Sequence, residues 1–125
     1  MARVLALVPD LLFGSRVQGS LAAAGHEVEL IADEPALRRR LTDTTGPPAA
    51  VLVVDLTNED LDGAGIVESL SGGGSLGQIR TLGFYSHVDV PARERAEKAH
   101  FDQVVPRSRM AREGDELVTR LAASA

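Results

Sequence analysis

The sequence predicts a doubly wound α/β domain, in which parallel strands alternate with helices that cover both faces of one sheet. Three observations lead to this prediction. Unbroken apolar runs at residues 4–8 and 50–54 are typical of strands buried on both faces. Strand and helix patterns alternate five times with short connections, which favours a parallel sheet. The chain has 125 residues, 44% of them hydrophobic, which is enough for one domain with an ordinary core.

The composition argues against several other classes of protein. The chain contains no cysteine, which excludes disulfides and thiolate metal sites. The apolar run after Arg3 is too short for a signal peptide or a membrane span, so we expect a cytoplasmic protein that does not bind membranes. A net charge of -5 gives no electrostatic basis for binding nucleic acid. His26, His87 and His100 lack the short spacing of a metal site.

The first strand and helix are marked by local signals. Pro9 ends the strand at residues 4–8, because proline has no N–H to donate to the sheet. Asp10 stands where the N-cap of a helix belongs, and Gly25 closes that helix. The apolar positions between them have helical spacing: Phe13, Val17, Leu21 and Ala24. A helix buries one face, so of the three apolar residues 11–13 we expect one or two at the rim of the sheet.

The second strand and helix are more polar. Residues 26–32 begin with alternating polar and apolar positions, which is typical of an edge strand with one wet face. Asp33 opens a helix in which residues 38–40, three arginines, lie largely in solvent. A loop at residues 45–48 leads into the strand that ends at Asp55.

The second half of the chain continues the alternation. After an acidic turn segment, with Asp60 and Asp62 in solvent, we expect a helix near residues 65–70 and a strand at residues 81–86. The glycine-rich connection at residues 71–75 follows a helix and lacks the Lys-Ser/Thr ending of a phosphate-binding loop. The remaining elements are a helix from residue 90, a polar strand at residues 101–105 stopped by Pro106, and a last helix interrupted or delayed by Gly114.

The polarity of the strands predicts their order. The strands at residues 26–32 and 101–105 are the polar ones, so we place them at the edges. With right-handed crossovers, these edges select the order 2-1-3-4-5, which is the flavodoxin-like arrangement. Ligands of such sheets bind outside the carboxyl ends of the strands, where Asp55 stands.

Five short segments resemble, in their order and spacing, the receiver domain of response regulators, the CheY-like family. They are residues 4–8, residues 23–28, Asp55-Leu56 with Asp62-Gly63 after it, residues 86–89 and residues 102–107. The likeness covers nearly the whole chain, which implies one receiver-like domain at residues 1–125 without an output domain. In receiver domains an aspartate accepts a phosphoryl group, two further acids hold Mg2+, and a Thr or Ser and a Lys bind the phosphoryl oxygens.

The resemblance assigns this chemistry position by position. Asp55 matches the phosphoacceptor, and Arg107 falls on the lysine position. Tyr85 falls on the hydroxyl position, and Ser86 follows it. Val104 stands at the position of the switch aromatic of the fifth strand. The acid pair falls on Val8 and Pro9, so only Asp10, one residue later, offers a carboxylate there. The resemblance therefore implies a degenerate pseudo-receiver.

Several interpretations of these residues stay open. Asp55 is a phosphoacceptor, a ligand-binding carboxylate or a cap for the turn at Thr57. The Tyr85 ring covers the phosphoryl cavity, hydrogen-bonds Asp55 or packs under the last helices. Asp10 is an N-cap or, with a shifted turn, a metal ligand. Residues 107, 109 and 112 are arginines that form an anion-binding cluster or an ordinary surface.

The sequence predicts a non-enzymatic, phosphorylation-independent module that binds a protein partner in signalling, without a cofactor. One alternative is a phosphorylatable stand-alone regulator, which would need Mg2+. Another is a small-ligand domain, although no glycine-rich turn follows the first strand. The resemblance implies a partner surface on the fourth helix, the fifth strand and the last helix, where the partner is another protein or a second copy of this chain.

Overall fold

The computed structural model describes residues 2–43, 45–86 and 88–124. Within these residues the strands form one parallel sheet in the order β2-β1-β3-β4-β5, so the predicted fold is confirmed. The strands are β1 (Arg3–Leu7), β2 (Glu27–Ile31), β3 (Val51–Asp55), β4 (Arg80–Tyr85) and β5 (Gln103–Pro106). The helices are α1 (Leu11–Ala23), α2 (Glu34–Thr42), α3 (Gly63–Gly72), α4 (Val90–Lys98) and α5 (Arg107–Ala123).

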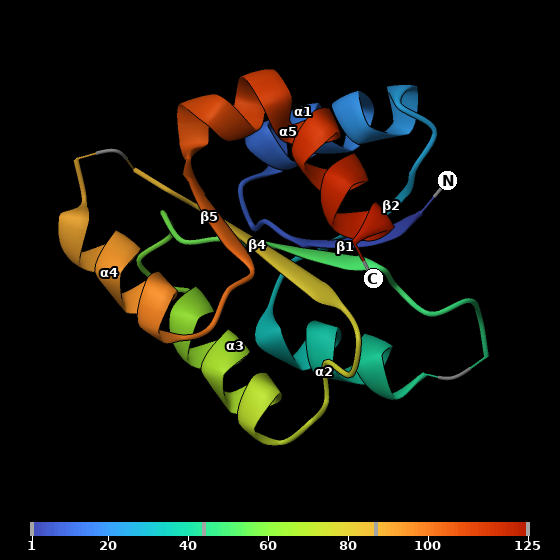
Figure 1. Ribbon diagram of the computed structural model, residues 1–125, viewed down its shortest axis with the longest axis horizontal. Coiled ribbons are helices and arrows are strands. Elements are labelled where there is room, and N and C mark those ends of the chain that lie inside the picture. Colours follow the sequence, from blue (N-terminus) through green and yellow to red (C-terminus); the bar gives the residue numbers. More distant parts are fainter. Residues whose placement is uncertain (1, 44, 87, 125) are drawn as a thin grey trace.

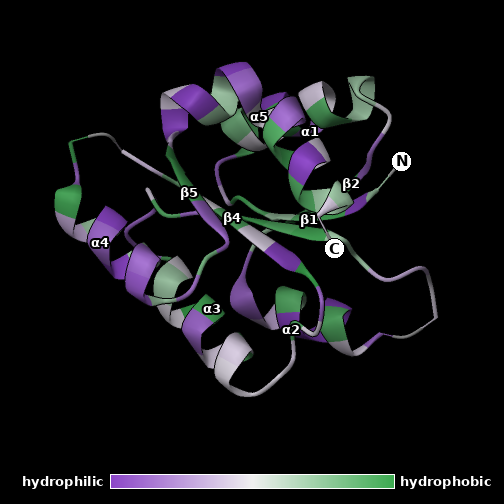
Figure 2. Ribbon diagram, in the orientation of Figure 1, coloured by the Kyte–Doolittle hydropathy of each residue, from purple (hydrophilic) through white to green (hydrophobic). Residues whose placement is uncertain are grey.

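Helices cover both faces of the sheet. One core lies between the sheet and helices α1 and α5, and a second core lies between the sheet and helices α2 and α3. Helix α4 lies beside α3 (Figure 1). Every residue of β3 is buried, whereas β2 and β5 are partly exposed, as expected for edge strands. Hydrophobic residues follow the sheet, and hydrophilic residues mark the outer sides of α4 and α5 (Figure 2).

Local signals set most of the helix ends. The Asp10 side chain caps α1, and the Asp33 side chain caps α2, as predicted. After α1 the chain turns at Gly25, whose φ of 93° is a left-handed conformation that glycine adopts without a Cβ penalty. In the described part of the chain, no helix is both long enough and apolar enough to cross a bilayer.

The prediction that Gly114 interrupts or delays the last helix is wrong. Helix α5 runs unbroken from Arg107 to Ala123, and Gly114 is buried within it. A Cβ at Gly114 would lie 2.9 Å from the Cε of Met110, so the glycine makes room for that side chain against the sheet. The helical packing outweighs the low helix propensity of a single glycine, which costs about 1 kcal/mol.

Candidate crevice at the carboxyl ends of the strands

Asp55 ends the central strand β3 and is only 2% exposed. Its Oδ1 accepts two hydrogen bonds from Thr57, one from the backbone N at 2.7 Å and one from Oγ1 at 2.6 Å. These bonds close the turn that follows the strand, so the interpretation of Asp55 as a turn cap is confirmed. In the described residues, the carboxylate has no ion pair with an arginine or lysine.

Asp10 and Arg107 meet at the start of helices α1 and α5. The Oδ1 of Asp10 accepts hydrogen bonds from the backbone N of Leu12 and of Phe13. Its Oδ2 lies 3.6 Å from an Nη of Arg107. The guanidinium of Arg107 also covers the ring of Phe13, with 4.2 Å between Cζ and the ring centroid. The N-cap interpretation of Asp10 is thus confirmed, and both side chains already have partners within the protein.

The side chains of Tyr85 and Asp55 project from opposite faces of the sheet. The β3–β4 register pairs Asp55 with Phe84, and side chains alternate between the two faces of a strand. Tyr85 therefore shares its face with Gly83, where a Cβ would lie 2.8 Å from Leu56. Among the described residues, the Tyr85 hydroxyl makes no hydrogen bond to Asp55, whose bonds come from the following turn. The register gives no support to a Tyr85 ring that covers the carboxylate.

Ser86 follows β4 as a half-buried turn residue. The strand ends at Tyr85 and does not extend to Ser86. Only a strand that was one residue longer would have brought the Ser86 hydroxyl to the position where receiver domains have a Thr or Ser. The carbonyl of Ser86 accepts a hydrogen bond from the backbone N of Asp89, which begins the connection to α4. His87 lies outside the described residues. Val104 in β5 is half-buried, and it places no aromatic ring at the position of the switch aromatic.

The carboxylates of the crevice do not fit a magnesium site. Mg2+ needs near-octahedral oxygen ligands, usually one or two carboxylates with several waters. Val8 and Pro9 carry no side-chain oxygen, and the backbone N of Val8 donates to Ile31 as an extension of the sheet. Asp10 serves as the cap of α1. No group of three or more His, Cys, Asp or Glu side chains in the described residues is arranged to hold a metal ion.

Each arginine at the start of α5 lies near a carboxylate, although two of them share one glutamate. Arg107 pairs with Asp10, and both Arg109 and Arg112 lie within 4.0 Å of Glu113. These contacts therefore favour an ordinary charged surface over an anion-binding cluster. At the rim of the same edge, Leu11 and Leu12 are 80% and 82% exposed, as the sequence predicted for two of three apolar residues.

An ion pair that the sequence analysis missed joins α3 to α4. The Asp62 side chain caps α3 through the backbone N of Gly65, and it also binds Arg95 of α4 with N–O distances of 2.7 and 2.9 Å. The hydrogen bond from Arg95 lowers the pKa of the Asp62 carboxyl, and the same pair raises the pKa of Arg95. The Asp62 side chain is more than half exposed, as expected of a turn residue in solvent, but it also caps a helix and binds an arginine, which the sequence did not indicate.

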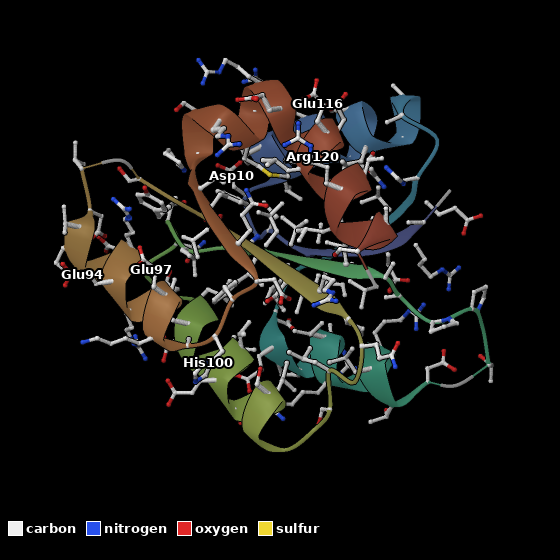
Figure 3. All side chains as sticks on the ribbon, viewed as in Figure 1. Asp10, Glu94, Glu97, His100, Glu116 and Arg120 are labelled. Carbon is white, nitrogen blue, oxygen red and sulfur yellow. The ribbon has the colours of Figure 1, made fainter. Side chains whose placement is uncertain are left out.

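Two larger cavities lie at the opposite, amino ends of the strands. One of about 610 Å3 is lined by residues such as Arg80, His100 and Asp102, and one of about 550 Å3 by His26 and Thr119. At the carboxyl edge, a cavity of about 230 Å3 lies between α3 and α4. Figure 3 shows His100 well apart from Asp10. His26 and His100 line these two cavities, at the amino ends of the strands.

His26 has a structural role at that end of the sheet. It is buried, its Nδ1 accepts from the backbone N of Ala2, and its Nε2 lies 2.9 Å from the Thr119 hydroxyl. That hydroxyl donates to the carbonyl of Asp115, so the imidazole must donate through Nε2. The ring therefore fixes the N-terminal segment against α5.

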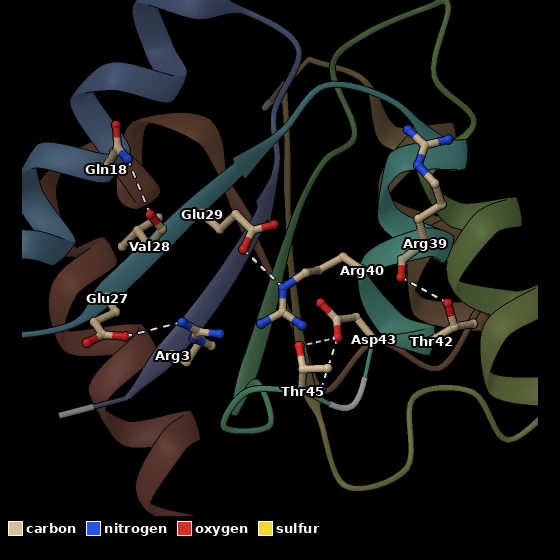
Figure 4. A network of polar contacts seen from close by, with 10 residues as sticks. All are labelled: Arg3, Gln18, Glu27, Val28, Glu29, Arg39, Arg40, Thr42, Asp43 and Thr45. Carbon is tan, nitrogen blue, oxygen red and sulfur yellow. Dashed lines mark hydrogen bonds and ion pairs between the residues drawn. The ribbon is translucent and has the colours of Figure 1, made fainter.

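A polar network covers the start of β1 and β2 (Figure 4). Arg3 pairs with Glu27, and Arg40 of α2 pairs with Glu29 at 3.0 Å. Only 14% of the Arg40 side chain is exposed, so the prediction that residues 38–40 lie largely in solvent is wrong for this residue. The hydrogen bonds from Thr45 and the charges of Arg40 and Arg3 lower the pKa of the Asp43 carboxyl at the end of α2.

Comparison with known proteins places the fold. No protein-family model matches the chain, and no curated protein sequence matches it. Solved structures match over nearly the whole chain. The structure of FixJ-N is 19% identical in sequence and has a TM-score of 0.84. The match covers 100% of this chain and 96% of the FixJ-N chain. The receiver domain of the Francisella response regulator 1452 is 14% identical with a TM-score of 0.82, over 99% of this chain and 98% of its own.

A third similar structure is the receiver domain of the sensor histidine kinase PA1611 from Pseudomonas aeruginosa PAO1, which has a magnesium ion coordinated in its active-site cleft. It is 14% identical with a TM-score of 0.82, and the match covers 98% of each chain. The chain therefore has the fold of response-regulator receiver domains, and the resemblance predicted from five short segments is confirmed at the level of the fold.

Proposed function

We propose that this protein is a pseudo-receiver, a cytoplasmic, non-enzymatic module that binds a protein partner in a signalling pathway without being phosphorylated. The observation that carries this proposal is how the crevice carboxylates are used. Asp55 accepts both hydrogen bonds of Thr57 through Oδ1, and Asp10 caps α1 and pairs with Arg107. Neither arrangement supplies the pair of free acids after the first strand with which receiver domains hold Mg2+.

Phosphoryl transfer to Asp55 would be slow in this arrangement. A phosphodonor that approaches the carboxylate meets like-charge repulsion, which a divalent cation normally offsets. Arg107 is the arginine that the resemblance assigns to phosphoryl binding, but its guanidinium covers Phe13 and pairs with Asp10. Breaking that pair to reach a phosphoryl group would leave the Asp10 charge unpaired.

One observation favours a phosphorylatable regulator instead. Asp55 stands at the carboxyl end of the central strand, and both of its hydrogen bonds go to Oδ1, so Oδ2 has no partner among the described residues. A small-ligand domain has less support, because the cavity at this edge, about 230 Å3, is below the range of about 300–1,000 Å3 typical of ligand pockets.

Acetyl phosphate with Mg2+, followed by intact-mass measurement, tests the proposal. We expect no adduct of one phosphoryl group under conditions in which a phosphorylatable receiver domain, run in parallel, is labelled. We also expect Tyr85→Thr to remain unlabelled, because the missing acids and not the ring limit the reaction. An adduct on the natural protein that is lost in Asp55→Asn would overturn the pseudo-receiver and establish the phosphorylatable regulator.

The resemblance implies that partners bind to α4, β5 and α5. The exposed side of this surface is mostly charged: Figure 3 shows Glu94 and Glu97 on α4 and Glu116 and Arg120 on α5. Such a surface suits a polar, reversible interface, in which charge complementarity selects the partner. Exchanging Glu94 and Glu97 for lysine should abolish partner binding without unfolding the domain, and unchanged binding would move the interface elsewhere.

A further inference from the structure

The Asp55 carboxylate is buried but only half satisfied. It is 2% exposed, and Thr57 gives both of its hydrogen bonds to Oδ1. In the described residues Oδ2 has no hydrogen-bond partner, and the carboxylate has no ion pair. A carboxylate can accept hydrogen bonds at both oxygens, and a buried one that lacks them costs free energy. A donor that reached Oδ2 from the crevice would therefore be bound favourably.

The charges around the crevice favour a donor that is positive. The exposed carboxylates that follow β3 and β4 and make no ion pair in the described residues are Glu59, Asp60 and Asp89. Arg95 beside them is paired with Asp62. Arg107 is paired with Asp10. The negative charges thus stay without compensation, so the crevice attracts cations and repels anions.

The exposed apolar side chains of the domain surround the same place. Four large hydrophobic residues are exposed in the described part of the chain: Leu11, Leu12, Val88 and Val90. The first two follow β1 and the last two follow β4, which are the strands on either side of β3. Segments that follow neighbouring parallel strands emerge at the same edge of a sheet. These four residues, the apolar rim, therefore flank the end of β3 on both sides.

A lysine side chain fits this combination of a buried carboxylate and an apolar rim. Its ammonium group is compact and needs only one acceptor oxygen, whereas the guanidinium of arginine binds best to both oxygens of a carboxylate. Thr57 already occupies Oδ1. The four-carbon stem of lysine is apolar and packs on hydrophobic surface while its charged end reaches a polar group.

We propose that the carboxyl edge of the sheet is a docking site for a lysine of the protein partner, flanked by apolar residues. The ammonium group donates to Oδ2 of Asp55, and the flanking residues cover the apolar rim. This inference rests on the proposed function, because it takes the partner to be a protein. It adds what that partner must carry, and it gives Asp55 a binding role that needs neither phosphorylation nor Mg2+.

A peptide with one lysine between two leucines, blocked at both ends, tests the inference through the amide chemical shifts of the isotope-labelled protein. We expect saturable shifts at residues 55–57 with a dissociation constant on the order of 1 mM. The same peptide with an acetylated lysine keeps the stem without the charge, and it should bind at least about tenfold more weakly.

Variants of the protein locate the contact. Asp55→Asn removes the charge and should weaken the lysine peptide about tenfold while leaving the acetylated peptide unchanged. Val88→Ser shortens the apolar rim and should weaken both peptides about threefold. Glu94→Gln is the matched control, because it removes one exposed carboxylate from the outer side of α4, and it should change neither peptide.

Three results would overturn the inference. They are equal binding of the two peptides, an effect of Glu94→Gln as large as that of Asp55→Asn, and no saturable shift at about 10 mM peptide. If Asp55→Asn does not fold, the comparison of the two peptides on the natural protein decides alone. Labelling by acetyl phosphate together with binding of the lysine peptide would overturn the proposed function and support this inference. Neither labelling nor binding would overturn this inference alone.

Discussion

The Asp55 carboxylate is stabilised by a neutral neighbour and not by a cation. It is 2% exposed, and Thr57 supplies both of its hydrogen bonds from within the following turn. A buried charge that loses such bonds is costly, since hydrogen bonds to charged groups contribute about 1.5–3 kcal/mol each. Thr57 is therefore as important to this site as the aspartate itself, although the resemblance assigned it no role.

Replacing Thr57 with valine tests this dependence. The variant keeps the shape of the side chain and the backbone donor but removes the hydroxyl, so we expect the free energy of unfolding to fall by about 2 kcal/mol. Urea denaturation at neutral pH measures the change. Thr57→Ser keeps the hydroxyl and should lose less than half as much. Equal stability of the valine variant and the natural protein would show that the hydroxyl bond contributes nothing in solution.

Helix α4 is attached to the domain by few groups. Within the helix only Ala96 is buried among the described residues, and Ala99 follows it at the C-terminal end. The Asp62–Arg95 pair adds a polar link from the start of α3. Because both side chains are more than half exposed, solvent and salt screen the pair, so its contribution to stability is small.

Two substitutions at Asp62 separate its roles as an ion-pair partner and as a cap. Asp62→Asn keeps an acceptor for the backbone N of Gly65 but removes the charge, so it should cost less than about 1 kcal/mol and less still at high salt. Asp62→Ala removes the cap as well and should cost about 1 kcal/mol more. Chemical denaturation of both variants at low and high salt measures these differences.

The pH dependence of the same pair has a definite sign. The hydrogen bond from Arg95 lowers the folded-state pKa of Asp62, so the pair stabilises the fold above the ordinary carboxyl pKa of about 4. That contribution is lost as the pH falls through the lowered value. The stability difference between Asp62→Asn and the natural protein should therefore vanish in strong acid, and a difference that persists there would exclude the ion pair as its cause.

The sheet was predictable because burial leaves a strong trace in the sequence. The unbroken run that ends at Asp55 became the central strand, and the alternating polar residues near Glu27 marked an edge. Contacts between distant polar residues leave no such trace. Arg95 binds Asp62 from 33 positions away, and Arg40 binds Glu29 across α2 and β2. Either arginine alone has the pattern of a solvated helix face.

The site was predictable in its positions but not in its contacts. The resemblance identified Asp55, Asp10 and Arg107, which all lie at the carboxyl edge as expected. It gave no indication that Arg107 covers Phe13, because that contact depends on the rotamer of a long side chain. The direction of Tyr85 followed from the strand register, which the sequence did not define to one residue.

At the scale of the molecule, the distribution of buried residues predicts a hierarchy of stability. All residues of β3 and most of β1 and β4 are buried between helices on both faces, so their amides open only when the whole domain unfolds. Helix α4 buries little apolar surface and should open locally.

Native-state hydrogen exchange in increasing denaturant measures this difference: amides of β3 should exchange with the free energy of global unfolding and a steep dependence on denaturant. Amides of α4 should exchange with a lower opening free energy that depends only weakly on denaturant. Asp62→Ala should lower the opening free energy of α4 further and leave local exchange elsewhere unchanged. If α4 and β3 amides merged at all denaturant concentrations, α4 would be an integral part of the cooperative core, and its attachment would depend on more than two alanines and one ion pair.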